Sequence, residues 1–598
     1  MGPYVARLAG ARASSSDSAE RPLGLSRSPS RKVAARRAGP GSSGCVYPGR
    51  VEPSRARQRR RRRRASFASS RGLATFAVAL GVLVFAGVQG FSSFGGDAAP
   101  DLAQPNVVLI VTDDQRHDTL AAMPVVRTEL AAKGVRFSNA AVVNPLCCPS
   151  RVSILTGLYS HSSGFYVQDS QSPEVAKAFA PVPNLATWLS GEGYETAFVG
   201  KYLNGYDGSF VPAGWSHWAA FSGLPAYYDY KLRGRAGHLS FGHAPADYST
   251  DVLAEEADAF VRAADPDRPL FLLFAPYAPH VEVSGDPPAA APRHGGSVPV
   301  EPWHPPSVGE DLGDKPAWLR SFAADLPPIA RHDSAEVRAG QLASLHAVDD
   351  AVGRILGALG DTGRLQDTLI VFTSDNGFTG GEHGLGNYKT IAYEESIRVP
   401  FIVRYDGRLP ADVEDDRLVA NIDIAPTVMD AAGATLDADG RSLLGNGEWR
   451  RDLLVEHTGT RIPTYCAVRS DTAMYAAFAD GAEELYDLVA DPHQLRNLAN
   501  SPLHREARHE LRLRLRELCR PPPPRFELPG VCTATGGPTD DRIRGTRWFD
   551  VLCAGAGNDR VWARDAQRDL VYCGPGRDRA YVDAADEMDG SCEIVQRR

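Results

Sequence analysis

Positive charge is scarce in this sequence beyond its first 65 residues. That opening segment holds 17 Lys and Arg against 3 Asp and Glu, a formal charge of +14, whereas the whole chain of 598 residues carries −8, which leaves −22 on the remainder. An acidic body argues against nucleic-acid binding and against a broad basic groove for long polysulfated chains. The composition is nevertheless globular, because 43% hydrophobic residues can furnish the cores of two or three domains.

Charge is absent altogether from residues 73–91, an apolar run of 19 residues that follows the arginine run Arg59 to Arg64. Its length lies between that of a signal-peptide core and that of a membrane span. The preceding arginines place the rest of the chain outside the cytoplasm in either case. We therefore expect a disordered Arg-rich segment at 1–72 and a signal peptide or membrane anchor at 73–91. The protein should be exported, either extracellular or on the outer face of the cytoplasmic membrane.

Cysteine is also scarce, with nine residues in the chain. Disulfides persist in exported proteins, which fits this small set. Four cysteines in the C-terminal tail allow three connectivities, and the sequence does not choose among them. These four are Cys532, Cys553, Cys573 and Cys592, and the others are Cys45, Cys147, Cys148, Cys466 and Cys519.

Polar side chains follow two strand-like runs of the sequence. Residues 106–112 and 368–374 are short continuous apolar stretches of the kind that forms strands buried on both faces. Ligands gather beyond the carboxyl ends of strands in open parallel sheets, so the side chains that follow could share one divalent cation. These side chains are Asp113, Asp114, Asp375 and Asn376. Oxygen ligands favour Ca²⁺ or Mg²⁺ over zinc, although each pair alone is more often a solvated turn or a helix cap.

Three basic residues follow other strand patterns or come close to one. Lys201 follows 196–200, His280 follows 270–275 through a Pro-Tyr-Ala-Pro loop, and Lys389 comes shortly after the second acidic turn. Helical patterns separate the strands at 185–189, 252–261 and 342–359. This alternation predicts an α/β fold with a mostly parallel central sheet covered by helices on both faces.

Cys147 opens the pattern of a further helix. Pro149 suits the first turn, and an apolar stripe at helical spacing follows. The stripe consists of Ile154, Leu155 and Leu158. Cys147 should then lie just before a helix N-terminus, where free backbone N–H groups and Arg151 favour an anionic group such as sulfate or phosphate. The competing interpretation is a buried structural cysteine pair ahead of an ordinary helix.

The motif Cys-x-Pro-Ser-Arg at 147–151, followed by Thr156-Gly157, resembles the sulfatase signature, in which the first cysteine is oxidised to formylglycine. Other matching motifs are Thr-Asp-Asp-Gln at 112–115, Gly-Lys-Tyr-Leu-Asn at 200–204, Ala-Pro-His at 278–280, Ser-Asp-Asn-Gly at 374–377, Tyr-Glu-Glu-Ser-Ile-Arg-Val-Pro at 393–400 and Asn-Ile-Asp-Ile-Ala-Pro-Thr at 421–427. The chain from about Asn106 to Cys519 resembles a type I sulfatase of the alkaline-phosphatase superfamily, most closely the N-acetylglucosamine-6-sulfatase branch.

The resemblance implies a set of site residues and a cofactor. A calcium ion, with magnesium as the alternative, would be held by Asp113, Asp114, Asp375, Asn376 and Cys147, the last modified to 3-oxoalanine (formylglycine) by a formylglycine-generating maturation enzyme. Arg151, Lys201, His280 and Lys389 would hold the sulfate and shuttle protons. Leu203 stands where many sulfatases carry a histidine, which leaves open which group does that histidine's work. His161 and His383 are weaker candidates for the site.

In the mechanism that the family implies, formylglycine is hydrated to a geminal diol: one hydroxyl attacks sulfur and expels the alcohol, and the other then drives sulfate release. The expected substrate is a small-molecule or glycan sulfate ester. For this branch, the resemblance implies a sulfated sugar such as N-acetylglucosamine 6-sulfate, as in glycosaminoglycan degradation. One alternative is a formylglycine-dependent phosphonate monoester or phosphodiester hydrolase of the same superfamily. A second is a non-catalytic glycan-binding relative.

The remaining chain divides into smaller parts. We expect the catalytic domain at 105–455, with a strand at 399–404 and a helix at 424–432 near its end. A C-terminal antiparallel α+β subdomain should follow at 456–520, with short strands at 467–468, 474–478 and 485–486 and a basic helix at 505–516. Glu456, His457 and Tyr465 are weak candidates for its wall of the pocket. A Pro-rich linker is expected at 521–530.

Residues 531–598 carry an aspartate every nine or ten positions, each followed two positions later by an apolar residue. The aspartates are Asp541, Asp550, Asp559, Asp569 and Asp578, and the apolar residues are Ile543, Leu552, Val561, Val571 and Ala580. The pattern resembles a degenerate calcium-binding nonapeptide β-roll that lacks most of its glycines. The alternative is a small disulfide-held β module, so calcium binding by this all-β tail stays open.

Overall fold

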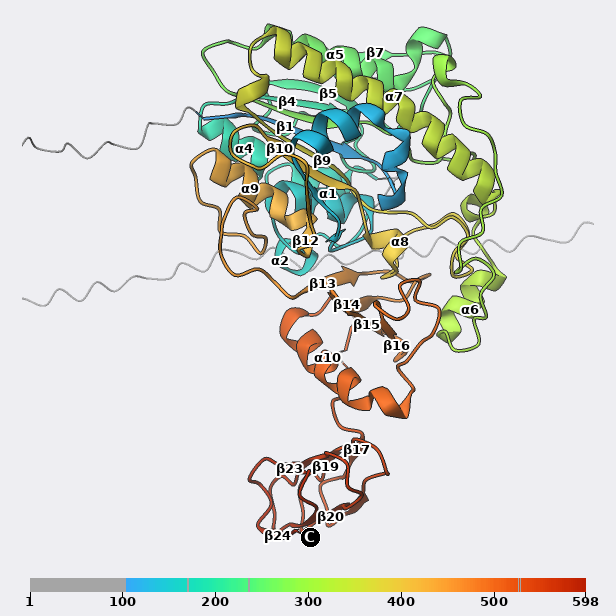
Figure 1. Cartoon of the computed structure of the whole chain (residues 1–598), viewed down its shortest axis with the longest axis vertical. Coiled ribbons are helices and arrows are strands. Elements are labelled where there is room, and N and C mark those ends of the chain that lie inside the picture. Colours follow the sequence, from blue (N-terminus) through green and yellow to red (C-terminus); the bar gives the residue numbers. More distant parts are fainter. Residues whose placement is uncertain (1–103, 169–171, 235–236, 525, 528, 598) are drawn as a thin grey trace, which may run out of the picture. The chain divides into compact units, whose positions relative to one another are not determined.

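The computed structural model describes residues 104–168, 172–234, 237–524, 526–527 and 529–597 (Figure 1). The segments expected to be disordered (1–72) and to act as signal peptide or anchor (73–91) lie outside these residues. None of the helices in the described ranges is both long and apolar enough to span a bilayer.

A ten-stranded sheet organises the catalytic region, in the order β11-β2-β10-β9-β1-β8-β4-β5-β6-β7. Its strands are β1 Asn106–Thr112, β2 Val135–Phe137, β4 Glu195–Gly200, β5 His217–Phe221, β6 Lys231–Gly234, β7 Gly237–Ser240, β8 Leu270–Ala275, β9 Thr368–Ser374, β10 Phe401–Tyr405 and β11 Val413–Asp415. The adjacent strands β9, β1, β8 and β4 are all parallel, which confirms the predicted mostly parallel sheet. β10 begins two residues later than predicted, after Pro400, and pairs antiparallel with β9.

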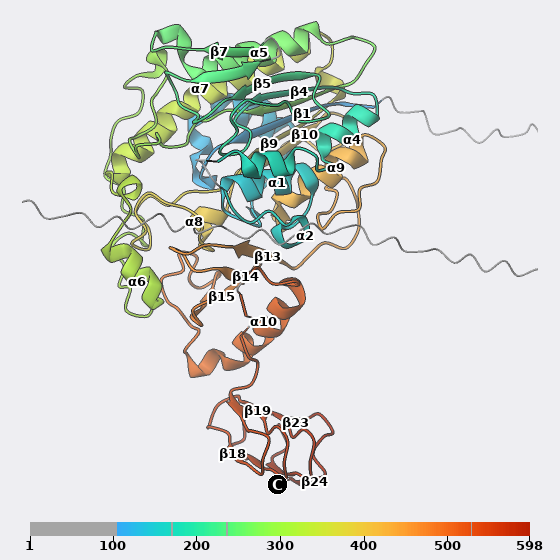
Figure 2. The same ribbon diagram turned by 180° about the vertical axis from the view of Figure 1, so that it is seen from behind.

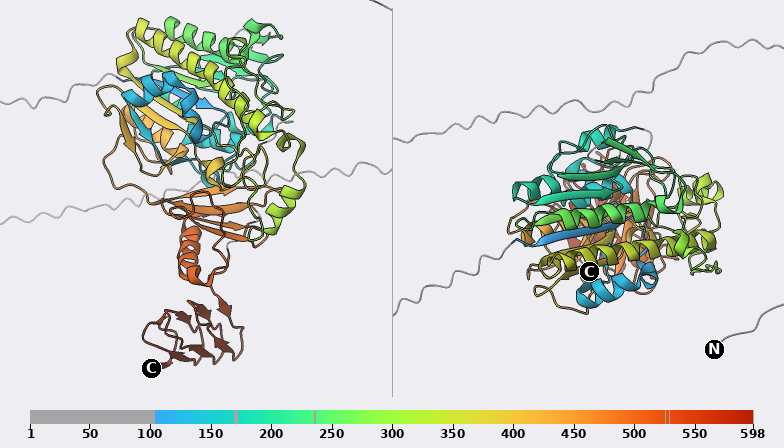
Figure 3. Two further views of the ribbon diagram at one scale, coloured as in Figure 1. Left: turned by 45° about the vertical axis from the view of Figure 1, so that its right-hand side comes forward. Right: turned by 90° about the horizontal axis from the view of Figure 1, so that it is seen from above.

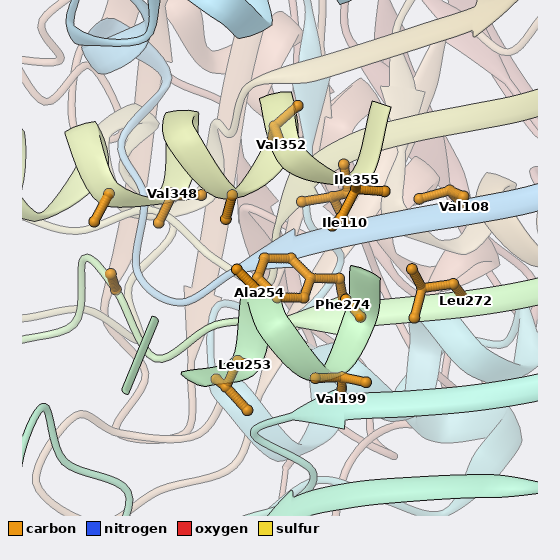
Figure 4. Packing of buried hydrophobic residues seen from close by; sticks show 14 of the residues in the cluster. Val108, Ile110, Val199, Leu253, Ala254, Leu272, Phe274, Val348, Val352 and Ile355 are labelled. Atoms are coloured by element: carbon orange, nitrogen blue, oxygen red, sulfur yellow. The ribbon is translucent and has the colours of Figure 1, made fainter. Parts of the chain in front are cut away.

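Helices cover both faces of this sheet (Figures 1 and 2). On one face, α5 (Ser249–Ala263) and α7 (Ser334–Asp361) pack over alternate residues of β1, Val108 and Ile110 (Figure 4). The intervening residues of β1 point to the other face, where they meet α1, α4 and α9. These helices span Cys147–Thr156, Leu185–Gly191 and Ile424–Ala431. Burial on both faces explains why the central strands read as uninterrupted apolar runs.

Shorter elements complete the catalytic region and connect it onward. They are α2 Ser160–Ser163, α3 Glu174–Phe179, α6 Ala317–Ala324, α8 Glu394–Ile397, and a two-stranded pair of β3 Ala140–Ala141 with β12 Val419–Ala420.

Helix α1 differs in two details from the sequence-based prediction. It begins at Cys147 itself, with Leu146 in extended backbone as the preceding residue, so the cysteine lies in the first turn and not before it. It ends at Thr156, because Gly157 takes a left-handed conformation with φ 74° and caps the helix. The predicted stripe was therefore wrong at Leu158, which lies beyond the helix.

A four-stranded antiparallel sheet forms the centre of the next unit, with strands β13 Asp452–His457, β14 Tyr465–Ser470, β15 Ala473–Phe478 and β16 Glu483–Asp487. Its first strand crosses the boundary expected at 455/456. Helix α10 (Arg505–Leu518) packs on this sheet (Figure 3, orange) through Leu515. A disulfide joins Cys466 to Cys519.

The tail forms two parallel four-stranded sheets, β17-β19-β21-β23 and β18-β20-β22-β24. The strands are β17 Ala534–Thr535, β18 Arg542–Arg544, β19 Val551–Cys553, β20 Arg560–Ala563, β21 Leu570–Tyr572, β22 Arg579–Val582, β23 Glu587–Met588 and β24 Ile594–Arg597. The predicted apolar positions, such as Val561 and Ala580, are buried between the sheets. Of the three possible connectivities, the tail has Cys532–Cys553 and Cys573–Cys592.

The repeated aspartates stack from coil to coil of the tail. The backbone N–H of Asp541 donates to the carboxylate of Asp559 at 2.7 Å, and that of Asp559 donates to Asp578 at 2.7 Å. Asp550 donates in the same way to Asp569 at 2.8 Å. One carboxylate oxygen is thus used to join successive coils, while the Oδ2 atoms of Asp559, Asp569 and Asp578 are buried without a hydrogen bond.

Candidate active site

Four neighbouring strands end at one edge of the sheet and deliver the polar residues predicted from the sequence. The register pairs Thr112 of β1 with Ser374 of β9, and Gly200 of β4 with Ala275 of β8. The residues after these strands must therefore meet, as expected for parallel strands. Gly200 is required at this edge, because its φ is +127° and a side-chain carbon would lie 1.9 Å from the carbonyl oxygen of Ala275.

The oxygen ligands predicted from the sequence are brought together with no exposed surface. The Asn376 side-chain amide donates to Asp114 Oδ1 at 2.6 Å, and the backbone N–H of Asp114 donates to Asp375 Oδ1 at 3.1 Å. Three buried oxygens make no hydrogen bond: Oδ2 of Asp113, Oδ2 of Asp114 and Oδ1 of Asn376. Asp113 Oδ2 is ion-paired with the Lys201 ammonium group, whereas Asp114 Oδ2 has only the His280 ring, at 3.5 Å, and Asn376 Oδ1 has no partner within the described chain. Buried polar atoms are normally satisfied, so the oxygens of Asp114 and Asn376 have room for a further positive partner.

The arrangement fits a divalent cation. One ligand atom from each of Asp113, Asp114, Cys147 and His280 lies within 4.8 Å of the others. Unpaired carboxylate and amide oxygens suit a hard ion such as Ca²⁺ or Mg²⁺. Asp375 is engaged differently, because its Oδ2 accepts a hydrogen bond from Arg151 Nε at 2.8 Å.

Cys147 lies at the centre of this cluster and is fully buried. Its Sγ lies 3.6 Å from Asp113 Oδ1, 3.4 Å from Lys201 Nζ and 3.0 Å from Lys389 Nζ. Burial raises the pKa of the thiol to about 12, although the two lysines oppose the rise. Cys148 faces elsewhere, since its sulfur accepts the backbone N–H of Asn204 at 3.1 Å.

Arg151 holds several parts of the site in place. Besides binding Asp375, its Nη1 donates to the carbonyl oxygen of Lys201 at 2.7 Å, and its Nη2 lies 3.6 Å from Asp113 Oδ2. Nη2 is buried without a hydrogen bond. The guanidinium thus ties α1 to the ends of β9 and β4 and has one N–H group left for an anion.

The two lysines remain protonated. Burial alone would lower the pKa of Lys201, but Asp113, together with Cys147 and Asp375, outweighs burial and raises the pKa. Burial would also lower the pKa of Lys389, but Asp114 and the neighbouring groups of the site together hold that pKa well above its ordinary value. Burial would raise the pKa of Asp113, yet Lys201, His280 and Arg151 hold it below its ordinary value. The site is therefore an array of full charges.

His280 is poised differently. Burial lowers its pKa, with Asp114 and Asp113 opposing the shift. Its Nδ1 lies 2.6 Å from the carbonyl oxygen of Val281, and its Nε2 lies 3.5 Å from Asp114 Oδ2. The ring stacks on Tyr277 with centroids 4.9 Å apart. Sequence reasoning missed Tyr277, although it belongs to the Pro-Tyr-Ala-Pro loop that was noted before His280.

A cavity of about 290 Å³ opens beside these groups. Asp114, Lys201, His280 and Lys389 line its charged part, and the apolar residues Leu224, Val283 and Ile329 line another part. Leu224 and Val283 are 48% and 51% exposed, so they mark the rim.

The weaker candidates do not line this cavity. His161 lies 3.2 Å from Glu456 Oε1, and His383 is buried between Glu310 and Glu395. His457 is buried beside Tyr465. The expectation that Glu456, His457 and Tyr465 form the pocket wall therefore finds no direct contact here.

Tyr465 instead contacts a residue next to one that lines the cavity. Its hydroxyl donates to the carbonyl oxygen of Thr390 at 3.4 Å, and Thr390 follows Lys389. Thr390 has a φ of +76°, a strained conformation for a β-branched residue. The C-terminal subdomain thus contacts the loop that presents Lys389.

Comparison with known proteins agrees with these features. The sulfatase family model matches residues 105–434, and a model described as N-sulphoglucosamine sulphohydrolase, C-terminal, matches 381–520. Human N-acetylglucosamine-6-sulfatase is 34% identical over 494 residues, which cover 72% of this chain and 87% of the relative. An extracellular sulfatase SULF-1 homolog of Drosophila melanogaster is 32% identical over 377 residues, and the match spans 60% of this chain but only 33% of that protein.

Solved structures show the same fold. A protein in complex with its substrate D-glucosamine-2-N,6-O-disulfate matches with a TM-score of 0.61 and 25% identity, over 70% of this chain and 98% of that one. A phosphonate monoester hydrolase of Agrobacterium radiobacter matches with a TM-score of 0.55 and 22% identity, over 70% and 95% of the two chains, which is a likeness of fold alone. Motifs, fold and relatives together show that the chain belongs to the sulfatase family of enzymes, within the alkaline-phosphatase superfamily.

Proposed function

We propose that the protein hydrolyses a sulfate ester of a sugar, such as N-acetylglucosamine 6-sulfate, with Cys147 matured to formylglycine beside a Ca²⁺ ion. The observation that carries the proposal is the position of Cys147, whose sulfur has Lys389 Nζ at 3.0 Å, Lys201 Nζ at 3.4 Å and Asp113 Oδ1 at 3.6 Å. Two ammonium groups and a carboxylate oxygen around one side-chain position suit an anionic ester next to a metal ion.

The unmodified thiol is a poor nucleophile for this reaction. Its pKa of about 12 keeps it protonated at neutral pH, and a sulfate transferred to sulfur would have no easy way to leave. A hydrated aldehyde at this position supplies two hydroxyl groups, one to displace the alcohol and one to drive sulfate release, and a bound Ca²⁺ supplies polarisation of the attacking oxygen. Asp113, Asp114, Asp375 and Asn376 would hold the ion.

The surrounding residues divide the remaining work. Lys389 and the Nη2 atom of Arg151, which makes no hydrogen bond, neutralise charge on the sulfuryl oxygens. Lys201, which is protonated, donates a proton to the departing alcohol. Neutral His280 donates its Nδ1 proton to Val281, which leaves Nε2 to accept a proton as base. His280 would therefore deprotonate the second hydroxyl group.

The size and lining of the cavity support a small or terminal sulfate ester. At about 290 Å³ it lies at the lower end of the range for small-molecule sites. Its apolar rim, with Leu224 and Val283, suits the apolar face of a sugar ring. Relatives named N-acetylglucosamine-6-sulfatase and the structure with a bound glucosamine disulfate support the sugar.

The test combines one variant, one control and one mass measurement. Cys147→Ala should abolish hydrolysis of an aryl sulfate, whereas Cys148→Ala, which removes the neighbouring thiol, should keep most of the activity. The Cys147 peptide of active protein should show the mass of the aldehyde. Retained activity in Cys147→Ala would sink the proposal. Comparing matched aryl sulfate and aryl phosphodiester substrates separates a sulfatase from a phosphonate or phosphodiester hydrolase, and absence of turnover in matured protein would indicate a non-catalytic relative.

We also propose that the protein is exported and matured by a formylglycine-generating enzyme. The described chain contains three disulfides, which persist in oxidising compartments. Two relatives carry the name extracellular sulfatase. Cell fractionation tests the location, with a purely cytoplasmic, reduced protein as the contrary result.

A further inference from the structure

One sheet of the tail carries a row of arginines in register. Arg542 of β18 pairs with Arg560 of β20, which pairs with Arg579 of β22. Paired residues of adjacent strands lie about 4.8 Å apart along the sheet. Like charges opposite one another destabilise a sheet, so this row costs the fold stability.

The row points away from the core of the tail. Ile543, Val561 and Ala580, which follow the three arginines, are buried between the two sheets. Successive side chains of a strand alternate between faces, so the arginines lie on the outer face. None of the three guanidinium groups makes a hydrogen bond or an ion pair anywhere in the described chain.

Acidic neighbours do not neutralise the row. Each of these arginines follows one of the stacked aspartates. Asp559 and Asp578 are buried and accept backbone N–H groups of the adjacent coil, and Asp541 accepts the N–H of Gly537. The carboxylates of Asp559 and Asp578 are therefore buried at the coil corners, whereas the guanidinium groups that follow them in sequence lie outside. The net negative charge of the whole chain therefore gives no indication of this local basic surface.

A second row on the same face contains two aromatic rings that contact two further arginines. Arg544 pairs with Trp562, which pairs with Tyr581. The two rings are parallel, with centroids 5.2 Å apart and planes at 2°. The guanidinium of Arg544 lies 5.1 Å from the Trp562 ring, and that of Arg564 lies 5.3 Å from the Tyr581 ring. These cation–π contacts restrain the arginines, which lowers the entropy lost when they bind a ligand.

We propose that this outer face of the tail, defined by Arg542, Arg544, Arg560, Arg564 and Arg579, binds a sulfated glycan chain. A guanidinium group can bind two oxygens of a sulfate group through paired hydrogen bonds. A regular row of guanidinium groups therefore complements a polymer with repeated anionic groups. The site lies on the tail and would hold a polymer while the separate cavity of the catalytic domain acts on one ester.

The ring stack favours a glycan over single-stranded nucleic acid. Bases bind to such surfaces by stacking on free aromatic faces. Here the Trp562 ring lies between Arg544 and Tyr581, and Tyr581 lies between Trp562 and Arg564. Both rings are therefore already engaged by each other and by guanidinium groups, and the unpaired guanidinium groups of Arg542, Arg560 and Arg579 remain for a ligand.

The test uses the full-length protein and two double variants that remove the same charge. The face variant is Arg560→Gln with Arg579→Gln, and the control is Arg547→Gln with Arg577→Gln, two exposed arginines in turns. Binding to immobilised dextran sulfate should weaken about tenfold in the face variant and less than about twofold in the control. Unmodified dextran should not bind.

Three further measurements complete the design. Cys147→Ala should bind dextran sulfate as the wild type does, and the face variant should hydrolyse a small aryl sulfate normally, which separates this inference from the proposed catalytic function. The unfolding midpoint of the face variant should not fall, because like charges have been removed. Equal weakening in both double variants, a lowered midpoint, or binding to DNA or to phosphatidylglycerol vesicles as tight as to dextran sulfate at the same ionic strength would overturn the inference.

Discussion

The Nζ atom of Lys389 lies 3.0 Å from the sulfur of Cys147, although 242 residues separate the two in sequence. Lys389 comes from the loop after β9, and Cys147 from the first turn of α1. The same lysine pairs with Asp114, which follows β1. One ammonium group therefore contacts both the proposed nucleophile position and a proposed metal ligand, which makes it a sharp test of the site.

Replacing Lys389 by Met should lower kcat on an aryl sulfate by about 10²–10³-fold, because a buried cation that faces the sulfuryl group is lost. Lys389→Arg should lose less, since the charge remains. Lys133→Met, which removes a half-exposed lysine paired with Glu129, is the control. A kcat for Lys389→Met close to that of the wild type would remove Lys389 from the site.

Removing divalent metal should abolish activity and lower stability together. Asp114 and Asn376 hold buried oxygens without a hydrogen bond, and the carboxylates of Asp113 and Asp114 lie close together, so a bound ion offsets the repulsion and the lost hydration. At free Ca²⁺ about 100 times its Kd, the free energy of unfolding should rise by about 2–3 kcal/mol. Thermal unfolding and turnover after chelation and after Ca²⁺ addition measure both effects. Unchanged activity in excess chelator would contradict the metal assignment.

His383 should make stability depend on pH. Burial would lower its pKa, but Glu395 and Glu310 raise it to about 9. An unfolded histidine titrates near about 6.5. Because the folded-state pKa is the higher one, this stabilisation is complete below about pH 6.5 and is lost as pH rises through about 9.

His383→Gln tests that dependence. At pH 6 it should lower the free energy of unfolding by about 3–5 kcal/mol, since two buried carboxylates lose their cation, and the difference from wild type should shrink above pH 9. Denaturant unfolding at both pH values measures this difference. His493→Gln, at an exposed position, should change little. A difference that does not vary with pH would show that His383 is not charged.

The disulfide between Cys466 and Cys519 should stabilise the C-terminal subdomain. It closes a stretch of 53 residues and joins β14 to the residue after α10, with both cysteines buried. Cys466→Ala with Cys519→Ala should cost about 2–4 kcal/mol. Faster amide hydrogen exchange in β14–β16 measures the loss. Cys573→Ala with Cys592→Ala, in the tail, is the control and should leave these strands unchanged.

Asp569 should weaken the tail at neutral pH. Burial, opposed by its hydrogen bond from Asp550, raises its pKa to about 8, and its Oδ2 has no partner. The folded state therefore holds a proton that the unfolded state has lost, so stability falls as pH rises from about 4 to about 8. Asp569→Asn keeps an oxygen for the Asp550 N–H and should raise the unfolding midpoint of the tail at pH 8 but not at pH 4. No gain at pH 8 would show that the carboxylate is already compensated.

Much of the fold could be predicted because local pattern and burial coincide in it. β1, β8 and β9 have the predicted bounds, since strands buried on both faces must be apolar throughout. The repeated apolar positions of the tail could also be predicted from the sequence, because each coil buries the same position. The ends of helices and strands were harder to predict. Helix α1 ends at Thr156 because Gly157 takes a left-handed conformation, which apolar spacing alone does not reveal.

The candidate site was predictable in its members but not in their contacts. Asp113, Lys201 and His280 follow strands, and the order of the strands then brings them to one edge. Nothing in the sequence indicated that Asp375 would be engaged by Arg151, or that His383 would be ion-paired with Glu310 and Glu395 in a buried cluster away from the cavity. Those outcomes depend on which charges face one another once water has been excluded.

By itself, the sequence determined the strand–helix alternation, the chemical set at the strand ends and the repeat of the tail, because each follows from residue type and spacing along the chain. Only the tertiary structure decided the disulfide pairs, the contact between Tyr465 and the Lys389 loop, and the outward row at Arg542, Arg560 and Arg579. The reason is that register and packing bring together groups that are distant in the chain, and the energy of a charge depends on those neighbours and not on its position in the sequence.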